Sequence, residues 1–196
     1  MNNRIVACGP DALEKAARIL NEGGVVVIPT DTVYGLAAHP SRPEAVDRLY
    51  SIKNREARKP IALLASDRHA VETSGFALPG RAGELADRFW PGALTMVLNR
   101  AEDAGRGGFA ATEGFRVPDF EWTRSLLAAC GGLLRVTSAN MSGAKAATDA
   151  AEALGSVGLS TDLVVDGGPS RGGTASTVVR FEHGEPVVLR QGGAII

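Results

Sequence analysis

Cations gather in one short segment of the chain. Lys53, Arg55, Arg58 and Lys59 fall within seven consecutive positions, and Pro60 follows them at the start of an apolar run. Arginine offers a bidentate fork and lysine a point charge, so this segment could clamp a polyphosphate. Cations at the carboxyl end of a helix are also commonly solvated without a ligand, so a structural role stays open.

Two polar clusters come directly after predicted strands. PTDTVYGLAA, which contains Thr32, follows the apolar run VVVI, and VTSANMSGAK, which contains Ser138 and Asn140, begins at the end of a second run. Hydroxyls, amides and carboxylates at strand ends can bind a small polar ligand where open α/β sheets place their sites. The same residues also form Asx and ST turns, so the first cluster could serve only as a strand cap.

A lone arginine and a glycine-rich stretch complete the candidates. Arg116 lies in TEGFRVP between apolar residues, where an arginine needs an anionic partner, either a structural carboxylate or a ligand. The stretch DGGPSRGGTASTVV holds Ser176 and leads on to Arg190, followed by glutamine and Gly192. It could fold over a ligand as a lid or serve as a hairpin connection.

Several familiar chemistries are excluded by the sequence. It contains no phosphate-binding G-x-x-x-x-G-K-[ST] motif, no G-x-G-x-x-G and no zinc-binding H-E-x-x-H. The spacing G-x-S-x-G occurs only within the glycine-rich stretch, at 168–172, without the strand-to-helix pattern of a nucleophile elbow, and His39, His69 and His183 stand singly. An enzyme with this sequence would therefore depend on positioning and charge rather than on a catalytic triad.

Strands and helices must hold these residues in place, and their patterns interleave along the chain. Pro10 opens an amphipathic helix that ends at Gly23, and Ser41–Glu44 has the pattern of a capping box at the start of a second helix. Residues 100–114 are rich in glycine and alanine and are predicted to be a loop. The remaining patterns predict strands over 25–28, 60–65, 94–98, 133–139, 163–166, 174–181 and 185–190, and helices over 80–90 and 121–130. This order predicts one α/β domain with a mixed sheet.

Composition narrows the class of protein. The chain has 196 residues, is 44% hydrophobic and carries a formal net charge of -1, which is unlike a strongly basic nucleic-acid wrapper. Its two cysteines have no disulfide or zinc spacing, and no stretch has the length of a membrane span. We therefore expect a cytoplasmic protein without a membrane segment.

The motifs taken in order resemble one family. PTDTVYGLA, K-x-R with KP, WPG, RVP, TSANMSG, STVV and RQG follow one another in the order typical of YrdC-like proteins, the threonylcarbamoyl-AMP synthases, from about residue 12 to 193. Each motif alone is weak, whereas the ordered set is highly specific. The resemblance implies a twisted mixed β-sheet flanked by helices, with a concave electropositive face. It further implies a single catalytic domain over residues 1–196, without the extra C-terminal domain of some relatives.

The activity implied by this resemblance is a condensation. The family joins L-threonine, bicarbonate or carbon dioxide, and ATP to give threonylcarbamoyl-AMP and pyrophosphate, for the modification of adenosine 37 in tRNA. A separate transferase complex then acts on tRNA, so at most weak direct tRNA binding is expected of this chain. No carboxylate cage for a metal is visible, so Mg²⁺ is expected to travel with the ATP phosphates.

The resemblance also assigns roles to individual positions. Lys53 and Arg55 match the family's catalytic and phosphate-binding positions, and Arg116 would face the threonine carboxylate. The ATP-binding positions are Lys53, Arg55, Lys59, Thr112, Asn140, Thr148 and Arg190, and the threonine-binding positions are Thr32, Arg116, Ser138 and Ser176.

Two departures from the family pattern concern this site. Ala93 stands where relatives usually have a second proline, and Asp119-Phe120 stands where they commonly have a histidine. The second change removes a polar side chain near the proposed threonine site.

Two other functions compete with the synthase. A non-catalytic RNA-binding or ribosome-assembly module could use the same fold, although neutral charge and 5% aromatic residues disfavour it. A carbamoyl-transfer domain of the kind in hydrogenase-maturation proteins is a third possibility, but those proteins have further domains.

Overall fold

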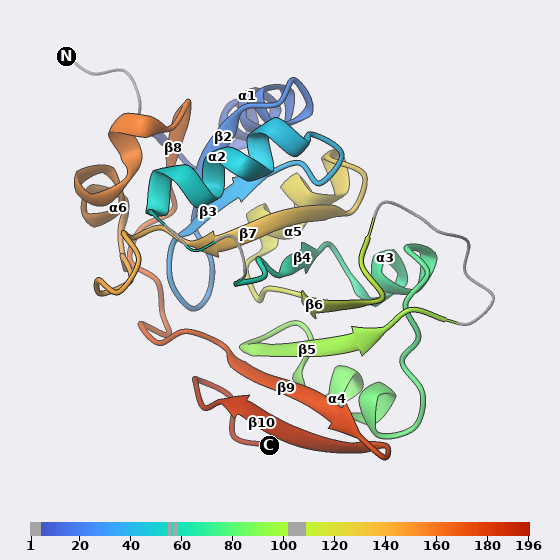
Figure 1. Cartoon of the computed structure of the whole chain (residues 1–196). Helices are drawn as coiled ribbons and strands as arrows, with labels where there is room; N and C mark the ends of the chain where they lie inside the picture. The colour runs from blue at the N-terminus through green and yellow to red at the C-terminus, as the bar shows by residue number, and fades with distance from the viewer. Residues whose placement is uncertain (1–4, 55, 57–58, 102–108) are drawn as a thin grey trace.

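A computed structural model describes residues 5–54, 56, 59–101 and 109–196 of the chain (Figure 1). The described helices are α1 (Pro10–Asn21), α2 (Pro43–Lys53), α3 (Arg68–Thr73), α4 (Arg81–Phe89), α5 (Glu121–Ala129), α6 (Ala150–Ser156) and a short 3₁₀ turn (Gly158–Ser160). The described strands are β1 (Ile5–Ala7), β2 (Val25–Ile28), β3 (Gly35–Ala38), β4 (Leu63–Ala65), β5 (Leu94–Asn99), β6 (Thr112–Arg116), β7 (Leu133–Ser138), β8 (Leu163–Asp166), β9 (Thr177–Glu182) and β10 (Glu185–Arg190).

All of these strands belong to one mixed sheet in the order β1-β8-β2-β3-β7-β4-β6-β5-β9-β10. The pairs β1–β8, β2–β8, β4–β6 and β5–β9 are parallel, and the other neighbours are antiparallel. The sheet with helices around it confirms the predicted fold class. Strand β2 reads VVVI and is buried on both faces, as a continuous β-branched run predicts.

Helices cover the two faces of the sheet differently. Helices α1 and α5 pack on one face through an apolar cluster that includes Leu20 and Leu126, whereas α2 and α6 pack on the other through a cluster that includes Leu49 and Ala153 (Figure 1). Cross-strand partners point to the same face, and the register links Ala38 to Arg135 and Arg135 to Leu63. Helices α3 and α4 therefore pack on the α2 side, because Leu63 belongs to their cluster.

The α1/α5 face leaves room for a site. Its apolar cluster reaches Leu64 in β4 and includes no residue of β5, β6 or β9. Side chains alternate along a strand, and Leu94, Met96 and Leu98 of β5 point into the cluster beneath α3 and α4. Thr95 therefore points to the part of the α1/α5 face that these two helices do not cover, and the candidate site lies there.

Some local predictions are wrong. Residues 112–114 belong to β6 rather than to a loop, because they pair with Val97, Leu98 and Asn99 of β5. Ser41 does not cap α2, which begins at Pro43 after Arg42 without a side-chain cap. The Ser41 hydroxyl instead contacts Nδ1 of His39 at 2.8 Å, two residues earlier in the chain.

Candidate functional site

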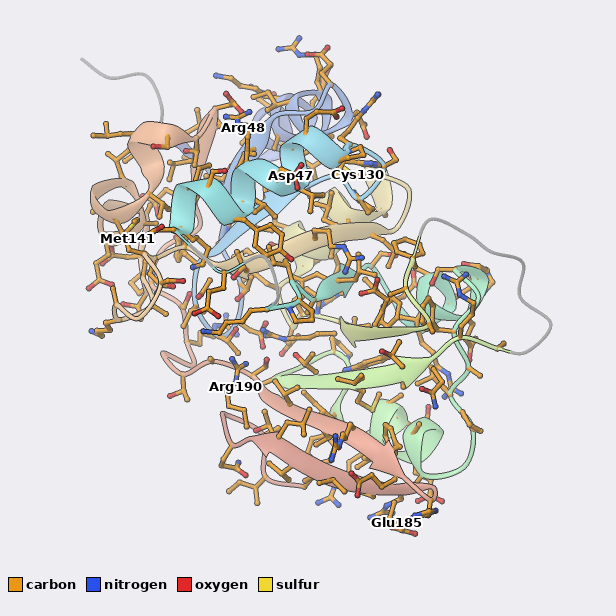
Figure 2. The ribbon with its side chains drawn as sticks, in the orientation of Figure 1. Asp47, Arg48, Cys130, Met141, Glu185 and Arg190 are labelled. Carbon is orange, nitrogen blue, oxygen red and sulfur yellow. The ribbon has the colours of Figure 1, made fainter. Side chains whose placement is uncertain are left out.

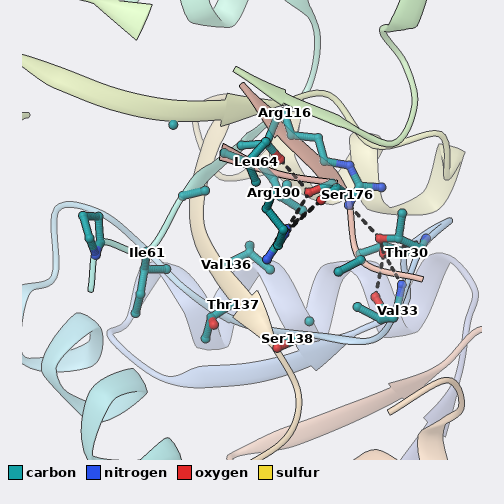
Figure 3. A pocket seen from close by; sticks show the side chains of 18 of the residues that line it. Thr30, Val33, Ile61, Leu64, Arg116, Val136, Thr137, Ser138, Ser176 and Arg190 are labelled. Atoms are coloured by element: carbon teal, nitrogen blue, oxygen red, sulfur yellow. Dashed lines mark hydrogen bonds between the residues drawn. The ribbon is translucent and has the colours of Figure 1, made fainter. Parts of the chain in front are cut away.

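A cavity of about 410 Å³ lies on this uncovered part of the α1/α5 face, against β4 to β7 and β9 (Figure 3). Its polar lining comes from segments far apart in the sequence, which the sheet order brings together. Six of the residues predicted from sequence line it: Thr32, Thr112, Arg116, Ser138, Ser176 and Arg190.

Arg116, at the end of β6, is held from several sides. Its Nε donates to the main-chain oxygen of Gly92 at 2.8 Å, Nη1 donates to the Thr32 hydroxyl at 2.7 Å, and Nη2 forms an ion pair with Asp31. Only 5% of the residue is exposed. Burial lowers the pKa of Arg116, and the Asp31 carboxylate opposes this shift. The guanidinium is therefore a fixed cation at one end of the cavity.

The PTDT segment forms both the expected turn and part of the cavity wall. The Thr30 hydroxyl donates to the Val33 oxygen at 2.6 Å and lies 3.0 Å from the Thr32 hydroxyl. The turn therefore uses Thr30, and the same turn presents Thr32 to Arg116. The strand-capping role and a ligand-facing role are compatible here.

The neighbouring wall of the cavity is built around Ser176, which directly precedes β9. Arg190 donates to the Ser176 main-chain oxygen from Nε at 3.1 Å and from Nη2 at 2.7 Å, and Nη2 lies 3.2 Å from the Ser176 hydroxyl. Figure 2 shows Arg190 at the end of β10. A Cβ on Gly192 would lie 2.2 Å from the Ala175 oxygen, so only glycine allows the chain to pass this close.

Lys53 and Asn140 lie beside the cavity and support its wall. Lys53, in the last turn of α2, is 2% exposed, and its ammonium donates to the main-chain oxygens of Ser138 and Asn140. The Asn140 amide donates to the oxygens of Met141 at 2.8 Å and Ala144 at 2.7 Å. Both side chains thus fix the loop after β7, and the phosphate and nucleotide contacts expected of them remain predictions.

The remaining predicted nucleotide residues lie apart from the cavity lining or cannot be placed. Lys59 is exposed and forms an ion pair with Glu56 at 3.5 Å. The Thr148 hydroxyl donates to Glu152 at 3.0 Å, near the start of α6. Arg55 lies outside the described residues.

Sequence reasoning missed a buried ion pair next to the site. Arg135 of β7 and Glu113 of β6 form two parallel contacts of 2.6 Å across the beginning of β4. Nη1 of Arg135 also donates to the Ile61 oxygen at 2.8 Å, and Ile61 and Glu113 both line the cavity. The available signal was a charged residue inside each of the two strand segments, because buried charges need partners.

Tyr34 ties the glycine-rich segment to the PTDT turn. Its hydroxyl donates to the Gly168 oxygen at 2.7 Å and accepts from the Gly167 N–H at 3.1 Å. In the same glycine-rich segment, the Gly172 N–H donates to the main-chain oxygen of Asp31 at 2.8 Å. Burial is the main cause that raises the pKa of Tyr34 to about 12. The glycine-rich segment therefore lies along one edge of the site, the position that a lid would need.

Comparison with known proteins places this geometry in a family. The model of the Sua5/YciO/YrdC family, described as telomere recombination, matches residues 18–192. The threonylcarbamoyl-AMP synthase of Bacillus subtilis is 35% identical over 184 residues, covering 92% of this chain and 53% of that protein. A relative from Mycobacterium leprae is 35% identical over 198 residues, covering 98% of this chain and 90% of that protein. This chain thus spans about half the length of the first relative and most of the second.

Solved structures of Sua5 and YciO proteins have the same fold as this chain. Pyrococcus abyssi Sua5 complexed with L-threonine has a TM-score of 0.87 at 33% identity, covering 96% of this chain and 57% of that one. Escherichia coli YciO has a TM-score of 0.82 at 26% identity, covering 96% of this chain and 94% of that one. The chain belongs to the Sua5/YciO/YrdC family, which confirms the resemblance found in its motifs.

Two features are absent from the residues that the structure describes. None of their helices has both the length and the apolar character needed to cross a membrane. No group of three or more His, Cys, Asp or Glu residues among them is arranged to hold a metal ion.

Proposed function

We propose that this protein is a nucleotidyltransferase that makes threonylcarbamoyl-AMP and pyrophosphate from L-threonine, bicarbonate or carbon dioxide, and ATP. The guanidinium of Arg116 is the strongest support in the structure, because it is a buried cation fixed at one end of a polar cavity. Relatives named for this activity and a threonine complex of a similar fold support the same assignment. The alternative of a non-catalytic RNA-binding module has no comparable support.

The reaction suits a site without a protein nucleophile. The threonine amine adds to the carbon source to form a carbamate, with loss of water when bicarbonate is used. A carbamate oxygen then attacks the α-phosphorus of ATP, and pyrophosphate leaves. The protein must orient three reactants and offset phosphate charge, and both tasks rest on preorganised polar groups.

We assign the amino acid to the end of the cavity formed by Arg116, Thr32 and Ser176. The Arg116 fork would bind the carboxylate, and hydroxyls would surround the rest of the molecule. Arg190 would face the phosphates from the Ser176 side. The nucleotide would extend toward Thr112 and Ser138, at the cavity's other polar positions.

Magnesium fits this scheme as part of the nucleotide. The described cavity offers no cage of carboxylates, and Mg²⁺ commonly binds through substrate phosphates while keeping several waters. We propose that it enters with ATP and offsets phosphate charge there. The adenylate would pass to a separate transferase that modifies tRNA, so this chain needs only weak tRNA affinity.

Pyrophosphate release tests the activity directly. Purified protein is incubated with ATP, bicarbonate, Mg²⁺ and one amino acid at a time. We expect release that depends on L-threonine and is absent with glycine. Release that does not change with the amino acid would exclude the synthase.

A further inference from the structure

Thr95 is a cavity residue to which the sequence motifs gave no role. It is the second residue of β5, between Leu94 and Met96, which are buried in the opposite cluster. Thr95 is 6% exposed and lines the cavity. A hydroxyl in this position of an otherwise apolar strand costs free energy unless it is hydrogen-bonded.

The partner of this hydroxyl is Ser176. Oγ1 of Thr95 lies 2.8 Å from Oγ of Ser176, and Nη2 of Arg190 donates to the same Ser176 oxygen at 3.2 Å. Two hydroxyls hold two protons, and their mutual contact uses one of them. The described residues provide no acceptor for the second proton, in either orientation of the pair. The pair is thus able to donate one hydrogen bond into the cavity.

This donor lies next to Arg116. Met96 pairs with Phe115 across β5 and β6, so the next position of the antiparallel register brings Thr95 alongside Arg116. Neighbouring strands are about 4.8 Å apart, which is the scale of a small amino acid. An amino acid whose carboxylate rests on Arg116 would therefore place a β-hydroxyl beside Thr95 and Ser176.

We propose that Thr95 is a specificity-determining residue that, with Ser176, recognises the side-chain hydroxyl of the amino-acid substrate. This role rests on the proposed synthase function. Thr95 fixes the Ser176 hydroxyl, and together they leave one donor for a β-hydroxy amino acid. An amino acid without that hydroxyl leaves the pair unsatisfied in a buried site, which is the kind of penalty that gives strong discrimination.

The test compares two amino acids on matched variants. L-Threonine and L-2-aminobutyrate differ by the hydroxyl, and Thr95→Val removes the protein's hydroxyl at nearly constant shape. We expect Thr95→Val to lower kcat/KM for L-threonine by about tenfold or more, mainly through KM. Both kcat/KM for L-2-aminobutyrate and KM for ATP should stay within about twofold. Thr95→Ser should restore the preference for L-threonine.

Controls separate this role from folding. Thr73→Val makes the same change on α3, where the hydroxyl donates to the His69 oxygen outside the cavity, and should leave all constants unchanged. If Thr95→Val loses its cooperative thermal transition, Thr95→Cys replaces it, because a thiol is a weaker donor of similar shape. Equal losses for both amino acids, or an unchanged preference in a folded variant, would overturn the role of Thr95.

Failure of the proposed function has a different signature. If the wild-type protein releases no pyrophosphate in response to L-threonine, the synthase assignment fails. Calorimetric titration of the wild type and Thr95→Val with each amino acid then still tests the hydroxyl pair. Tighter binding of L-threonine than of L-2-aminobutyrate, lost in the variant, would support the role of Thr95, and equal or absent binding would contradict it.

Discussion

The Asp31 carboxylate accepts hydrogen bonds from the Arg116 guanidinium and, at 3.1 Å, from the Asp119 N–H. Asp31 comes from the turn after β2, and Asp119 follows the RVP motif. One carboxylate therefore joins the two segments that form the Arg116 end of the cavity. It also compensates a cation whose side chain is only 6% exposed.

Replacing Asp31 should be costly because it leaves this cation without its partner. We expect Asp31→Asn to lower the free energy of unfolding by about 3 kcal/mol and to raise KM for L-threonine. Urea denaturation measures the first effect and pyrophosphate release the second. Asp47→Asn, on the exposed face of α2 (Figure 2), is the control and should change neither. A loss for Asp31→Asn as small as that of the control would contradict a structural role for the pair.

Gly35 should tolerate no side chain while Val136 faces it. A Cβ at this position would lie 2.5 Å from Cγ1 of Val136, and the pairing of β3 with β7 leaves little room to shift. We expect Gly35→Ala to destabilise the fold by about 2 kcal/mol. Adding Val136→Ala should recover part of that loss, so the two changes should be non-additive in urea denaturation. Simple additivity would show that the clash is relieved in another way.

The Glu113–Arg135 pair allows a double-mutant cycle. Each single change, Glu113→Leu or Arg135→Met, leaves a buried charge and should cost about 3 kcal/mol. The double variant removes both charges and should lose less stability than the sum of the singles. Equal costs for the pair and the sum, measured by the midpoint and slope of urea denaturation, would mean that the two charges do not interact.

Tyr34 predicts a loss of stability at alkaline pH. Its pKa is about 12 in the fold against an ordinary value of 10.0, so the neutral phenol is favoured by the native state. Its contribution is complete below pH 10 and is lost as pH rises toward 12, because the unfolded chain ionises first. Tyr34→Phe should be less stable at neutral pH and lose less over that interval. Parallel stability curves for the two proteins would contradict this.

Strong local patterns predicted the strands well. The apolar runs over 25–28 and 163–166 became β2 and β8 with the same bounds, since continuous β-branched residues suit buried strands. Strand β3, which reads GLAA, has no such signal and is a strand because β2 and β7 pair with it. Tertiary pairing decided its conformation.

For the site, too, local sequence predicted residue roles, whereas contacts between residues distant in the sequence were not predicted. A strand context for Arg116 was enough to predict an anionic partner, but Asp31 lies 85 positions away and no spacing rule connects them. Thr95 was not predicted, because the alternation of side chains along β5 does not say which face of that strand lines a cavity. Residue types indicated the chemistry, whereas the order of strands decided which residues meet.

The strand order also has a consequence for how the protein is made. Arg116 is in place once β4, β5 and β6 pair, but Ser176 and Arg190 join only when β9 docks in parallel beside β5. A chain growing from the ribosome would therefore carry a half-built pocket until the ribosome had passed residue 190. Until then, the apolar edge of β5 would stand open to chaperones or to pairing with other nascent chains.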